Sequence, residues 1–398
     1  MFLEIEGALM KPRPPETRAH KKVIVYTDGD SSLIRSWSNV PFLFTRALQD
    51  SGFDVVRVNI KAPWRFHLLY HYTVRPILRL LGASEFCDYS RSWIHDAWVQ
   101  SKAKRAGRDN PDAIAHIFLS FSHAFRARRG PPTLMFCDWS IAYLFERLLQ
   151  REPGFWERLA IRRQHRTMSY AKAVVTLFPE VAKHARSRID RASVYYLGNV
   201  INSVREPIEA AVRLAKKNSQ EILFIGSKKY LQGAKDLILA MKEIQACRPD
   251  LALRLCIIGM RPDEIDFALP PFVTCLGYLD KGDPDSCDTY YERLKVAKVV
   301  VNTTAGWGAF SSTLEAMHWF CPVITTPYDD FVATFGSSIA FGAYCRAGAP
   351  EQLASSLLEI ILSPSYEEYC LAANRASQPF TWGAFTNKFI NVMNEYAS

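Results

Sequence analysis

Residues 297–328 read AKVVVNTTAGWGAFSSTLEAMHWFCPVITTPY, and this segment carries the clearest pattern in the chain. The apolar run AKVVVNT is typical of a buried strand, and CPVITT is typical of another. Between them, TTAGWG indicates a turn, and helical spacing begins near Ser311 and Ser312. The segment therefore predicts a strand, a loop, a helix and a second strand in succession, which is the repeating unit of a parallel sheet.

The start of this predicted helix has the features of an anion site. Gly306 and Gly308 let the backbone approach a ligand closely, and the first amides of a helix lie at the positive end of its dipole. Together they suit a diphosphate. Glu315 falls in the first turn or so, where its carboxylate could accept hydrogen bonds from ribose hydroxyls. Alternatively, Glu315 only complements the helix dipole.

The rest of the second half repeats the alternation. Further strand-like runs are EILFIG, ALRLCIIG, FVTCLG and SIAFG. The loop GSKKYLQG after EILFIG offers Lys228 and Lys229 near the carboxyl end of a strand. These lysines could neutralise a leaving diphosphate, or the loop is an exposed basic turn. Helical patterns cover residues 234–244, 290–294 and 312–319.

The first half has a similar order of elements. KVIVYT ends in Asp28-Gly29-Asp30, Asn39 is a plausible N-cap before Pro41, and DVVRVNI is the next strand-like run. AIAHIFLSF, TLMFCDWS, AKAVVTLF and ASVYYLGNV follow as strand-like runs, and NVINSVREPIEA reads as a loop that leaves the domain. The chain is therefore expected to be α/β, with two doubly wound domains whose strand ends face each other across a cleft.

Length and composition limit the number of domains and the kinds of site that the chain can contain. The 398 residues suggest two domains, and no apolar run reaches the roughly 18–20 residues that span a bilayer. We expect residues 1–20 to be a flexible leader and the protein to be cytoplasmic. Nine cysteines without CxxC spacing argue against a zinc or redox site.

The charge is uneven along the chain. Residues 1–200 hold 31 Lys and Arg against 18 Asp and Glu, whereas residues 201–398 hold 18 against 22. A basic half indicates an anionic partner, such as phosphate groups, an anionic membrane surface or nucleic acid, or else a solvated basic surface. The segment 61–81 mixes aromatics, leucines and arginines, so it could lie on an anionic membrane or pack as an ordinary helix and loop.

Segments of the second half resemble the glycosyl transferases group 1 family, the retaining GT-B enzymes often called family 4. LFIGSKKYLQGAKDLILAMKEI, VTCLGYL and GAFSSTLEAMHWFCPVITT are similar to segments of its second domain, and PFTWGAFTNKFINVMNEY is similar to its helix that crosses back to the first domain. The resemblance implies an acceptor-side Rossmann-like domain of residues 21–203 plus 380–398, and a nucleotide-sugar domain of residues 204–379.

The family hallmark matches only in part. Glu315 matches its second Glu, whereas Trp307 stands where its first Glu would fall. Ser227 and Gln232 stand at its phosphate-binding Arg and Lys, so Lys228 or Lys229, or the weaker candidate Lys235, would supply that charge. The donor-binding residues that the resemblance implies are Gly226, Trp307, Gly308, Ala309, Phe310, Ser311, Ser312, Thr313 and Glu315.

In the first half, the resemblance points to the loops after strands. Asp138, at the end of TLMFCDWS, is the nearest match to a sugar-contacting His, and His116 and His123 are alternatives. Gly29 and Asp30 lie where family members bring the backbone close to the diphosphate and acceptor. Asp138, Lys228 and Lys229 are therefore the expected catalytic residues.

The resemblance implies transfer of a sugar, with retention, from a nucleoside diphosphate sugar to a hydroxyl of a glycan or lipid-linked acceptor, as in polysaccharide biosynthesis. No metal ion and no further cofactor are expected, and the enzyme would act in the cytoplasm or peripherally on the inner membrane face. An inactive homologue that binds nucleotide sugars or acts as a scaffold stays an alternative, because the hallmark is incomplete. A nicotinamide enzyme should show GxGxxG after a first strand, which this chain lacks, and nucleic-acid binding does not explain the second half.

Overall fold

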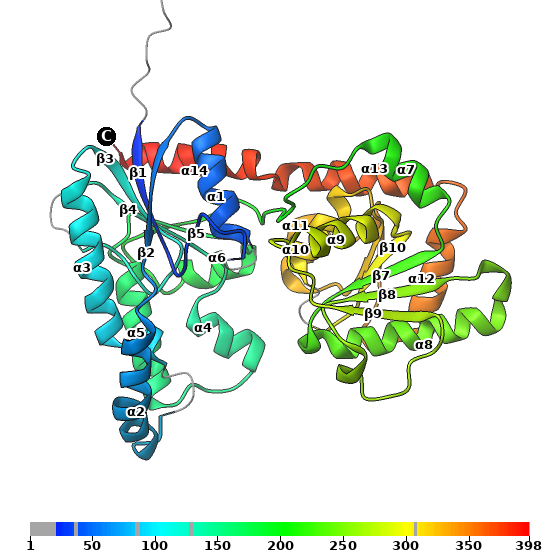
Figure 1. Ribbon diagram of the computed structural model, residues 1–398, viewed down its shortest axis with the longest axis horizontal. Helices are drawn as coiled ribbons and strands as arrows, with labels where there is room; N and C mark the ends of the chain where they lie inside the picture. Colours follow the sequence, from blue (N-terminus) through cyan, green and yellow to red (C-terminus); the bar gives the residue numbers. More distant parts are fainter. Residues whose placement is uncertain (1–20, 36–38, 84–87, 127–129, 306–308, 398) are drawn as a thin grey trace, which may run out of the picture.

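The computed structural model describes residues 21–35, 39–83, 88–126, 130–305 and 309–397. The chain forms two domains side by side, each built on a parallel sheet of six strands with helices around it (Figure 1). The expected α/β class with two doubly wound domains is confirmed. Both sheets form where the sequence shows short apolar runs, because a parallel strand is covered on both faces.

The first sheet has the strand order β2-β1-β3-β4-β5-β6, and the order reverses between β1 and β3. The strands are β1 (Lys22–Thr27), β2 (Asp54–Asn59), β3 (Ala113–Phe118), β4 (Thr133–Cys137), β5 (Ala173–Thr176) and β6 (Ser193–Tyr196). The helices are α1 (Val40–Asp50), α2 (Trp64–Leu80), α3 (Trp93–Asp109), α4 (Ile141–Tyr143), which continues as a π-helix (Leu144–Leu149), α5 (Phe155–Met168) and α6 (Pro179–Arg186).

The second sheet has the order β12-β11-β10-β7-β8-β9 and reverses between β7 and β10. In doubly wound sheets, ligands bind outside the carboxyl ends of the strands at such a reversal. Its strands are β7 (Glu221–Ile225), β8 (Arg254–Ile258), β9 (Val273–Gly277), β10 (Val299–Asn302), β11 (Val323–Thr325) and β12 (Gly342–Tyr344). Its helices are α7 (Glu209–Lys217), α8 (Leu231–Cys247), α9 (Pro284–Val296), α10 (Phe310–His318), α11 (Asp329–Phe335), α12 (Pro350–Ile361) and α13 (Tyr366–Ser377).

The chain crosses between the domains twice. It leaves the first domain after β6, and it returns after α13 through α14 (Trp382–Tyr396), which packs against α1 (Figure 1). The two crossings are joined, because the amide of Ile201 donates to the carbonyl of Phe380 at 3.0 Å. Lys388 also donates to the carbonyl of Leu197 at 3.1 Å.

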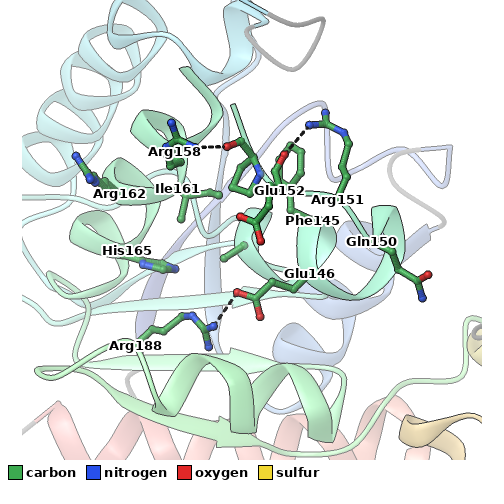
Figure 2. Close-up of a pocket in the computed structure, with 12 residues that line it drawn as sticks. Phe145, Glu146, Gln150, Arg151, Glu152, Arg158, Ile161, Arg162, His165 and Arg188 are labelled. Atoms are coloured by element: carbon green, nitrogen blue, oxygen red, sulfur yellow. Dashed lines mark hydrogen bonds and ion pairs between the residues drawn. The ribbon is translucent and has the colours of Figure 1, made fainter. Parts of the chain in front are cut away.

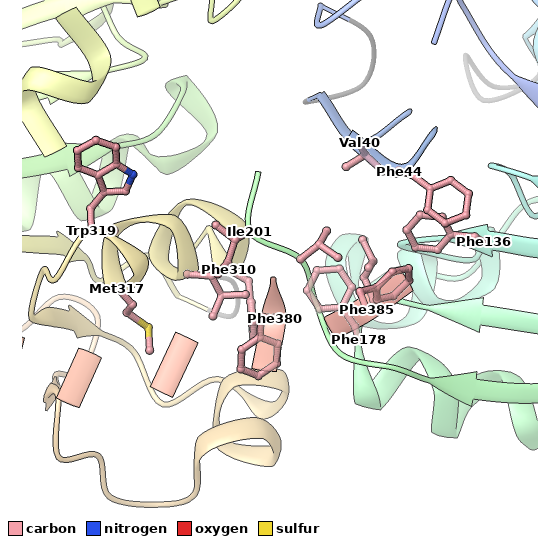
Figure 3. Close-up of a cluster of buried hydrophobic side chains, with 14 of the residues drawn as sticks. Val40, Phe44, Phe136, Phe178, Ile201, Phe310, Met317, Trp319, Phe380 and Phe385 are labelled. Atoms are coloured by element: carbon pink, nitrogen blue, oxygen red, sulfur yellow. The ribbon is translucent and has the colours of Figure 1, made fainter. Parts of the chain in front are cut away.

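Apolar packing is continuous across the two crossings. One cluster of buried side chains extends from the first sheet to α10 and the aromatic residues of α11. Figure 3 shows Ile201, Phe310 and Phe380 of this cluster in the region where the domains meet. The ring of Phe178 lies edge-on to that of Phe310, with 5.8 Å between their centroids. This packing joins the two domains where the chain crosses between them.

Two local predictions need correction, whereas the helix expected near Ser311 is present. It begins at Phe310, after Ala309 in a left-handed conformation (φ 51°). Asn39 does precede α1, but its φ is 72° and its side chain caps no amide. The strand expected at SIAFG lies later, at Gly342–Tyr344. Among the helices that the structure describes, none is long and apolar enough to cross a membrane.

Asp330 on α11 joins the two domains through hydrogen bonds. It is buried, its Oδ1 accepts from the amide of Glu180 at 3.0 Å, and its Oδ2 accepts from the Tyr143 hydroxyl at 3.4 Å. Burial raises the pKa of Asp330 to about 6, although the hydrogen bond from the Glu180 amide opposes the rise. The folded protein therefore keeps a proton on Asp330 at pH values where the unfolded chain has released it.

We predict that Asp330→Asn changes the pH dependence of stability. The contribution of Asp330 to the unfolding free energy rises as pH falls through about 6 toward 4, whereas asparagine contributes no titration. Relative to wild type, the variant should therefore gain about 2–3 kcal/mol between pH 4 and pH 7. Urea unfolding across this range measures the difference, and a difference that stays constant with pH would contradict the assignment.

Candidate active site

A cavity of about 500 Å³ lies between the domains, at the carboxyl ends of both sheets. The loops after β7, β8 and β9 and the start of α10 line it from the second domain. The loops after β4 and β5, the residues at the start of α1 and the first crossing line it from the first domain. A cavity of this size, shared by two domains and placed at a sheet reversal, is a typical ligand site.

The N-terminus of α10 borders this cavity. Ala309, Phe310, Ser311 and Ser312 all line it. The amides of the first turn have no acceptor within their own helix, and the helix dipole adds positive potential there. The serine side chains are already engaged, since Ser311 donates to Asn199 Oδ1 at 3.2 Å and Ser312 to the Ala309 carbonyl at 2.8 Å. The backbone is therefore the part of this turn that can receive an anion.

The loop after β7 faces the helix start. Gly226 lines the cavity, and its lack of a side chain is required by packing, because a Cβ there would lie 2.9 Å from Phe224 and 3.0 Å from Tyr230. Lys229 lines the cavity, and its ammonium lies 4.9 Å from the centre of the Tyr230 ring. Lys228 is exposed and is not part of the lining. Only one of the two predicted lysines thus reaches the site.

Asp138 approaches from the opposite wall. Its Oδ1 accepts from the Trp139 amide at 2.9 Å and the Cys137 thiol at 3.2 Å. Burial raises the pKa of Asp138, while these hydrogen bonds and the charge of Lys229 oppose the rise. Burial lowers the pKa of Lys229, and the charge of Asp138 opposes that change. A carboxyl group and an ammonium group from different domains therefore influence each other across one cavity.

Glu315 lies at the edge of the same cavity, and its carboxylate is fully engaged. The residue is 2% exposed. Lys281 donates to Oε1 at 2.6 Å and to Oε2 at 2.7 Å, Tyr290 donates to Oε2 at 2.9 Å, and Tyr291 donates to Oε1 at 3.1 Å. A carboxylate has about four acceptor positions, so all are in use. A ribose hydroxyl can bind Glu315 only if one of these donors moves.

Lys281 is as fully satisfied as its partner. Its third hydrogen bond, at 2.8 Å, goes to the carbonyl of Asn202 in the first crossing. Its ammonium also lies 4.5 Å from the centre of the Tyr290 ring, and both residues line the cavity. Lys281 is not among the residues predicted from the sequence. Its place in GYLDKGD could have indicated it, because this loop follows a short strand and the carboxyl ends of such strands face the cleft.

Two polar atoms in the cavity lining lack partners. Asn39 Nδ2 and Asn202 Oδ1 are buried and make no hydrogen bond with any residue that the structure describes. Buried polar groups are normally paired, so an unpaired donor and acceptor in one cavity indicate a polar ligand.

Other predicted residues lie away from the cavity. Gly29 and Asp30 form their own turn, where the Asp30 carboxylate accepts from the amide and hydroxyl of Ser32, at 2.8 and 2.7 Å. His116 is buried beside the Tyr26 hydroxyl at 2.7 Å, and burial lowers the pKa of His116 to about 4. His123 is buried near Asp96. None of these four predicted residues lines the cavity.

The remaining predicted residues have other roles. Thr313 is buried and donates to the Ala309 carbonyl at 3.3 Å, Gln232 donates to Asp236, and Lys235 pairs with Asp266. Gly306, Trp307 and Gly308 lie outside the described residues. Within the described part of the chain, no group of three His, Cys, Asp or Glu side chains could hold a metal ion.

Part of the second domain matches a known family. Residues 219–363 match the family model of glycosyl transferases group 1. No curated protein matches the sequence of the chain.

Solved structures extend the likeness to the whole chain. Sucrose-phosphate synthase from Thermosynechococcus elongatus is similar, with 13% identity, a TM-score of 0.66, and coverage of 94% of this chain and 99% of that one. A glycosyltransferase from Rickettsia africae has 12% identity, a TM-score of 0.62 and coverage of 95% and 99%. HepE from Anabaena, in complex with UDP and glucose, has 12% identity, a TM-score of 0.61 and coverage of 94% and 100%. The fold is that of GT-B glycosyltransferases.

We predict that Lys281 and Glu315 are strongly coupled in stability. Lys281→Ala and Glu315→Ala should each lower the unfolding free energy by about 3–5 kcal/mol, because each leaves a buried partner unpaired. The double variant should lose at least about 1 kcal/mol less than the sum of the two. Denaturant unfolding measures the cycle.

An exposed ion pair in the same domain provides the control. Arg248 and Asp250 are paired at 2.8 Å but exposed, so Arg248→Ala should change stability much less than Lys281→Ala or Glu315→Ala does. Strictly additive losses at Lys281 and Glu315 would show that the two residues do not act as a pair.

Proposed function

We propose that this GT-B glycosyltransferase, whose second domain matches glycosyl transferases group 1, transfers a sugar from a nucleoside diphosphate sugar to an acceptor hydroxyl. We further propose that transfer proceeds with retention and without a metal ion. One observation carries the proposal: the first amides of α10, Lys229 and Asp138 surround a single cavity at the carboxyl ends of both sheets. The incoming and leaving groups would meet there.

The second-domain wall suits the diphosphate. A helix N-terminus binds phosphate through amides that have no intrahelical partner, and Lys229 on the same wall adds positive charge. Charge grows on the leaving diphosphate as the sugar bond breaks, so donors that are already in place stabilise the transition state more than the ground state. These groups can supply the stabilisation of negative charge that a divalent cation would otherwise give.

The nucleoside would lie toward Glu315 and Lys281. Both residues border the cavity. Asn202 lies in the same lining, and its Oδ1 accepts no hydrogen bond from any residue that the structure describes. A ribose diol can displace Lys281 from one carboxylate oxygen and take its place, since a hydroxyl donates as the ammonium did. HepE from Anabaena, a protein of the same fold, was solved with UDP-glucose, which makes UDP the first nucleotide to test.

Asp138 would touch the transferred sugar or the attacking hydroxyl. It stands on the acceptor-side wall, opposite the groups assigned to the diphosphate. Burial raises the pKa of Asp138, which makes its carboxylate a stronger base toward a sugar hydroxyl than that of an exposed aspartate. In retaining transfer, the attacking hydroxyl would approach the same face of the sugar that the leaving diphosphate departs from. The enzyme would then accelerate the reaction mainly by holding the sugar and the hydroxyl in place.

A second candidate function is binding of a nucleotide sugar without transfer. It is favoured by the engaged Glu315 carboxylate and by Ser227 and Gln232, which replace the cationic residues of the family pattern. An inactive homologue would bind nucleotide and release no diphosphate with any acceptor, including water.

We predict that a nucleoside diphosphate stabilises the protein. Thermal-shift measurements with UDP, GDP, ADP and dTDP should show one nucleotide that raises Tm as its concentration exceeds its Kd. Lys229→Ala should weaken that nucleotide about tenfold or more, because a charged hydrogen bond to phosphate is lost, and should leave the free nucleoside within about twofold.

Lys228→Ala is the matched variant. Lys228 is the neighbouring residue but lies outside the cavity lining, so its replacement should change nucleotide affinity by less than about twofold. Equal losses from both replacements would refute the placement of the diphosphate, and an absence of binding by all four nucleotides would refute the proposed donor class.

We also predict that Asp138→Asn separates binding from transfer. The variant should bind the nucleoside diphosphate normally and lose at least about 100-fold in the rate of sugar transfer, because the acidic group that faces the sugar is gone. Release of nucleoside diphosphate from a panel of nucleotide sugars measures the rate. Wild-type rates in the variant would remove Asp138 from the catalytic residues.

A further inference from the structure

The helix α2 exposes an unusual amount of apolar surface. Only Tyr70 of its 17 residues is buried. Figure 1 shows α2 at the lower end of the first domain, beside α5 and away from the second domain. The strongly exposed apolar and aromatic side chains of α2 and the next residue are Trp64, Phe66, Leu68, Leu69, Tyr72, Ile77, Leu80 and Leu81.

The charged residues of the same helix are all basic. WRFHLLYHYTVRPILRL contains Arg65, Arg75 and Arg79 and no Asp or Glu. A helix that mixes exposed leucines with Trp, Tyr and Arg has the composition of helices that lie in the plane of an anionic membrane. Without a membrane or partner on it, this helix leaves a large apolar patch in water, and such patches usually mark interaction sites.

A basic pocket lies beside this helix. It encloses about 610 Å³ between α5 and the segment from the π-helix to Pro153. Figure 2 shows Arg158, Arg162 and His165 on α5, with Glu146 and Arg188 drawn below them. The full lining is Ala142, Phe145, Glu146, Gln150, Arg151, Glu152, Pro153, Arg158, Ile161, Arg162, His165 and Arg188.

The pocket has an excess of positive charge, because four arginines line it against the two acids Glu146 and Glu152. Arg151 forms two hydrogen bonds of 2.8 Å with Glu157, and Arg188 pairs with Glu146 at 2.7 Å. By contrast, Arg162 makes no hydrogen bond or ion pair with any residue in the described ranges. Arg158 donates to a backbone carbonyl, that of Pro153, at 2.6 Å, so its charge is not neutralised at that contact. A phosphate group fits such a pocket.

The helix α5 connects the pocket with α2. The indole of Trp156 on α5 donates to the carbonyl of Leu81 at 2.9 Å, which fixes the start of α5 to the end of α2. Phe155 and Leu159, on the same turns of α5 as Arg158, are exposed by 62% and 40%. Apolar side chains therefore continue from α2 to the rim of the pocket.

We propose that α2 and the start of α5 form a docking face for an anionic phospholipid membrane, with the basic pocket receiving a lipid phosphate. The exposed aromatic and leucine side chains would enter the region between headgroups and acyl chains, while the arginines contact phosphates. Residues 1–200 carry a net charge of +13 (31 minus 18). A basic charge spread over so much of the chain suits the extended surface of an anionic membrane better than a small acidic ligand bound in one pocket.

The basic pocket and the donor cavity are connected through shared lining residues. Glu146 and Gln150 line both the basic pocket and a cavity of about 470 Å³ at the domain junction, and Trp139 lines both that cavity and the donor cavity. A lipid-linked acceptor held at the membrane would reach the donor along these hollows. This last step rests on the proposed function, whereas membrane binding does not.

Vesicle flotation of the full chain tests the docking face without any nucleotide. Wild type should float with vesicles of equal parts phosphatidylcholine and phosphatidylglycerol and not with phosphatidylcholine alone. Trp64→Ser/Leu69→Ser and Arg158→Glu/Arg162→Glu should each weaken vesicle binding by more than about tenfold. Arg158→Gln/Arg162→Gln serves as a milder pair if the charge reversal disturbs folding, as judged by circular dichroism.

The matched control reverses two arginines elsewhere in the same domain. Arg105 and Arg108 on α3 are both exposed by 79%, and Arg105→Glu/Arg108→Glu should keep vesicle binding within about threefold of wild type. An equal loss in this control, or no flotation of wild type, would overturn the proposal. Binding of glycerol phosphate without binding of vesicles would also overturn it, since the pocket would then be a site for a soluble anion.

Discussion

The buried pair of Lys281 and Glu315 is the contact on which the donor side of the molecule depends. Two opposite charges out of water are tolerated only when their hydrogen bonds are complete. Here the ammonium donates three hydrogen bonds, to the two carboxylate oxygens and the Asn202 carbonyl, and two tyrosines of α9 complete the carboxylate. The pair thereby fixes α9, α10 and the loop after β9 to the crossing that joins the domains. A cavity wall built from these elements keeps its shape before any ligand arrives.

A fixed wall matters because the chemistry assigned to the cavity depends on placement. The amides that begin α10 and the ammonium of Lys229 lie on one side, and the Asp138 carboxyl lies on the other. Burial shifts the pKa of Asp138 upward and that of Lys229 downward, and each residue opposes the shift of the other. Bringing the domains closer would strengthen the attraction between Asp138 and Lys229. The domains are already joined by an ion pair, because Arg35 of the first domain lies 2.8 Å from Asp280 of the second. Electrostatics and domain arrangement are therefore linked.

The sequence predicts the strands and helices better than the contacts between them. Strands such as EILFIG and AKVVVNT are short apolar runs bounded by Gly, Asn or Thr, and a local pattern of this kind is enough to place them. The start of α10 lies where helical spacing predicts it, but the left-handed conformation of Ala309 before it is not revealed by that spacing. Glu315 stands out in the sequence as a lone acid near a helix start, yet its partners lie 34, 25 and 24 residues away. Which of two adjacent lysines faces the cavity likewise depends on the turn at Lys228–Tyr230.

A crystal structure of the chain with the nucleoside diphosphate that stabilises it most tests the central assignment directly. We expect the diphosphate within hydrogen-bond distance of the amides of residues 310–312 and Lys229 Nζ, and the ribose diol on Glu315, with Lys281 turned from at least one carboxylate oxygen. A nucleotide bound elsewhere, or one whose ribose leaves all four hydrogen bonds of Glu315 unchanged, would contradict it.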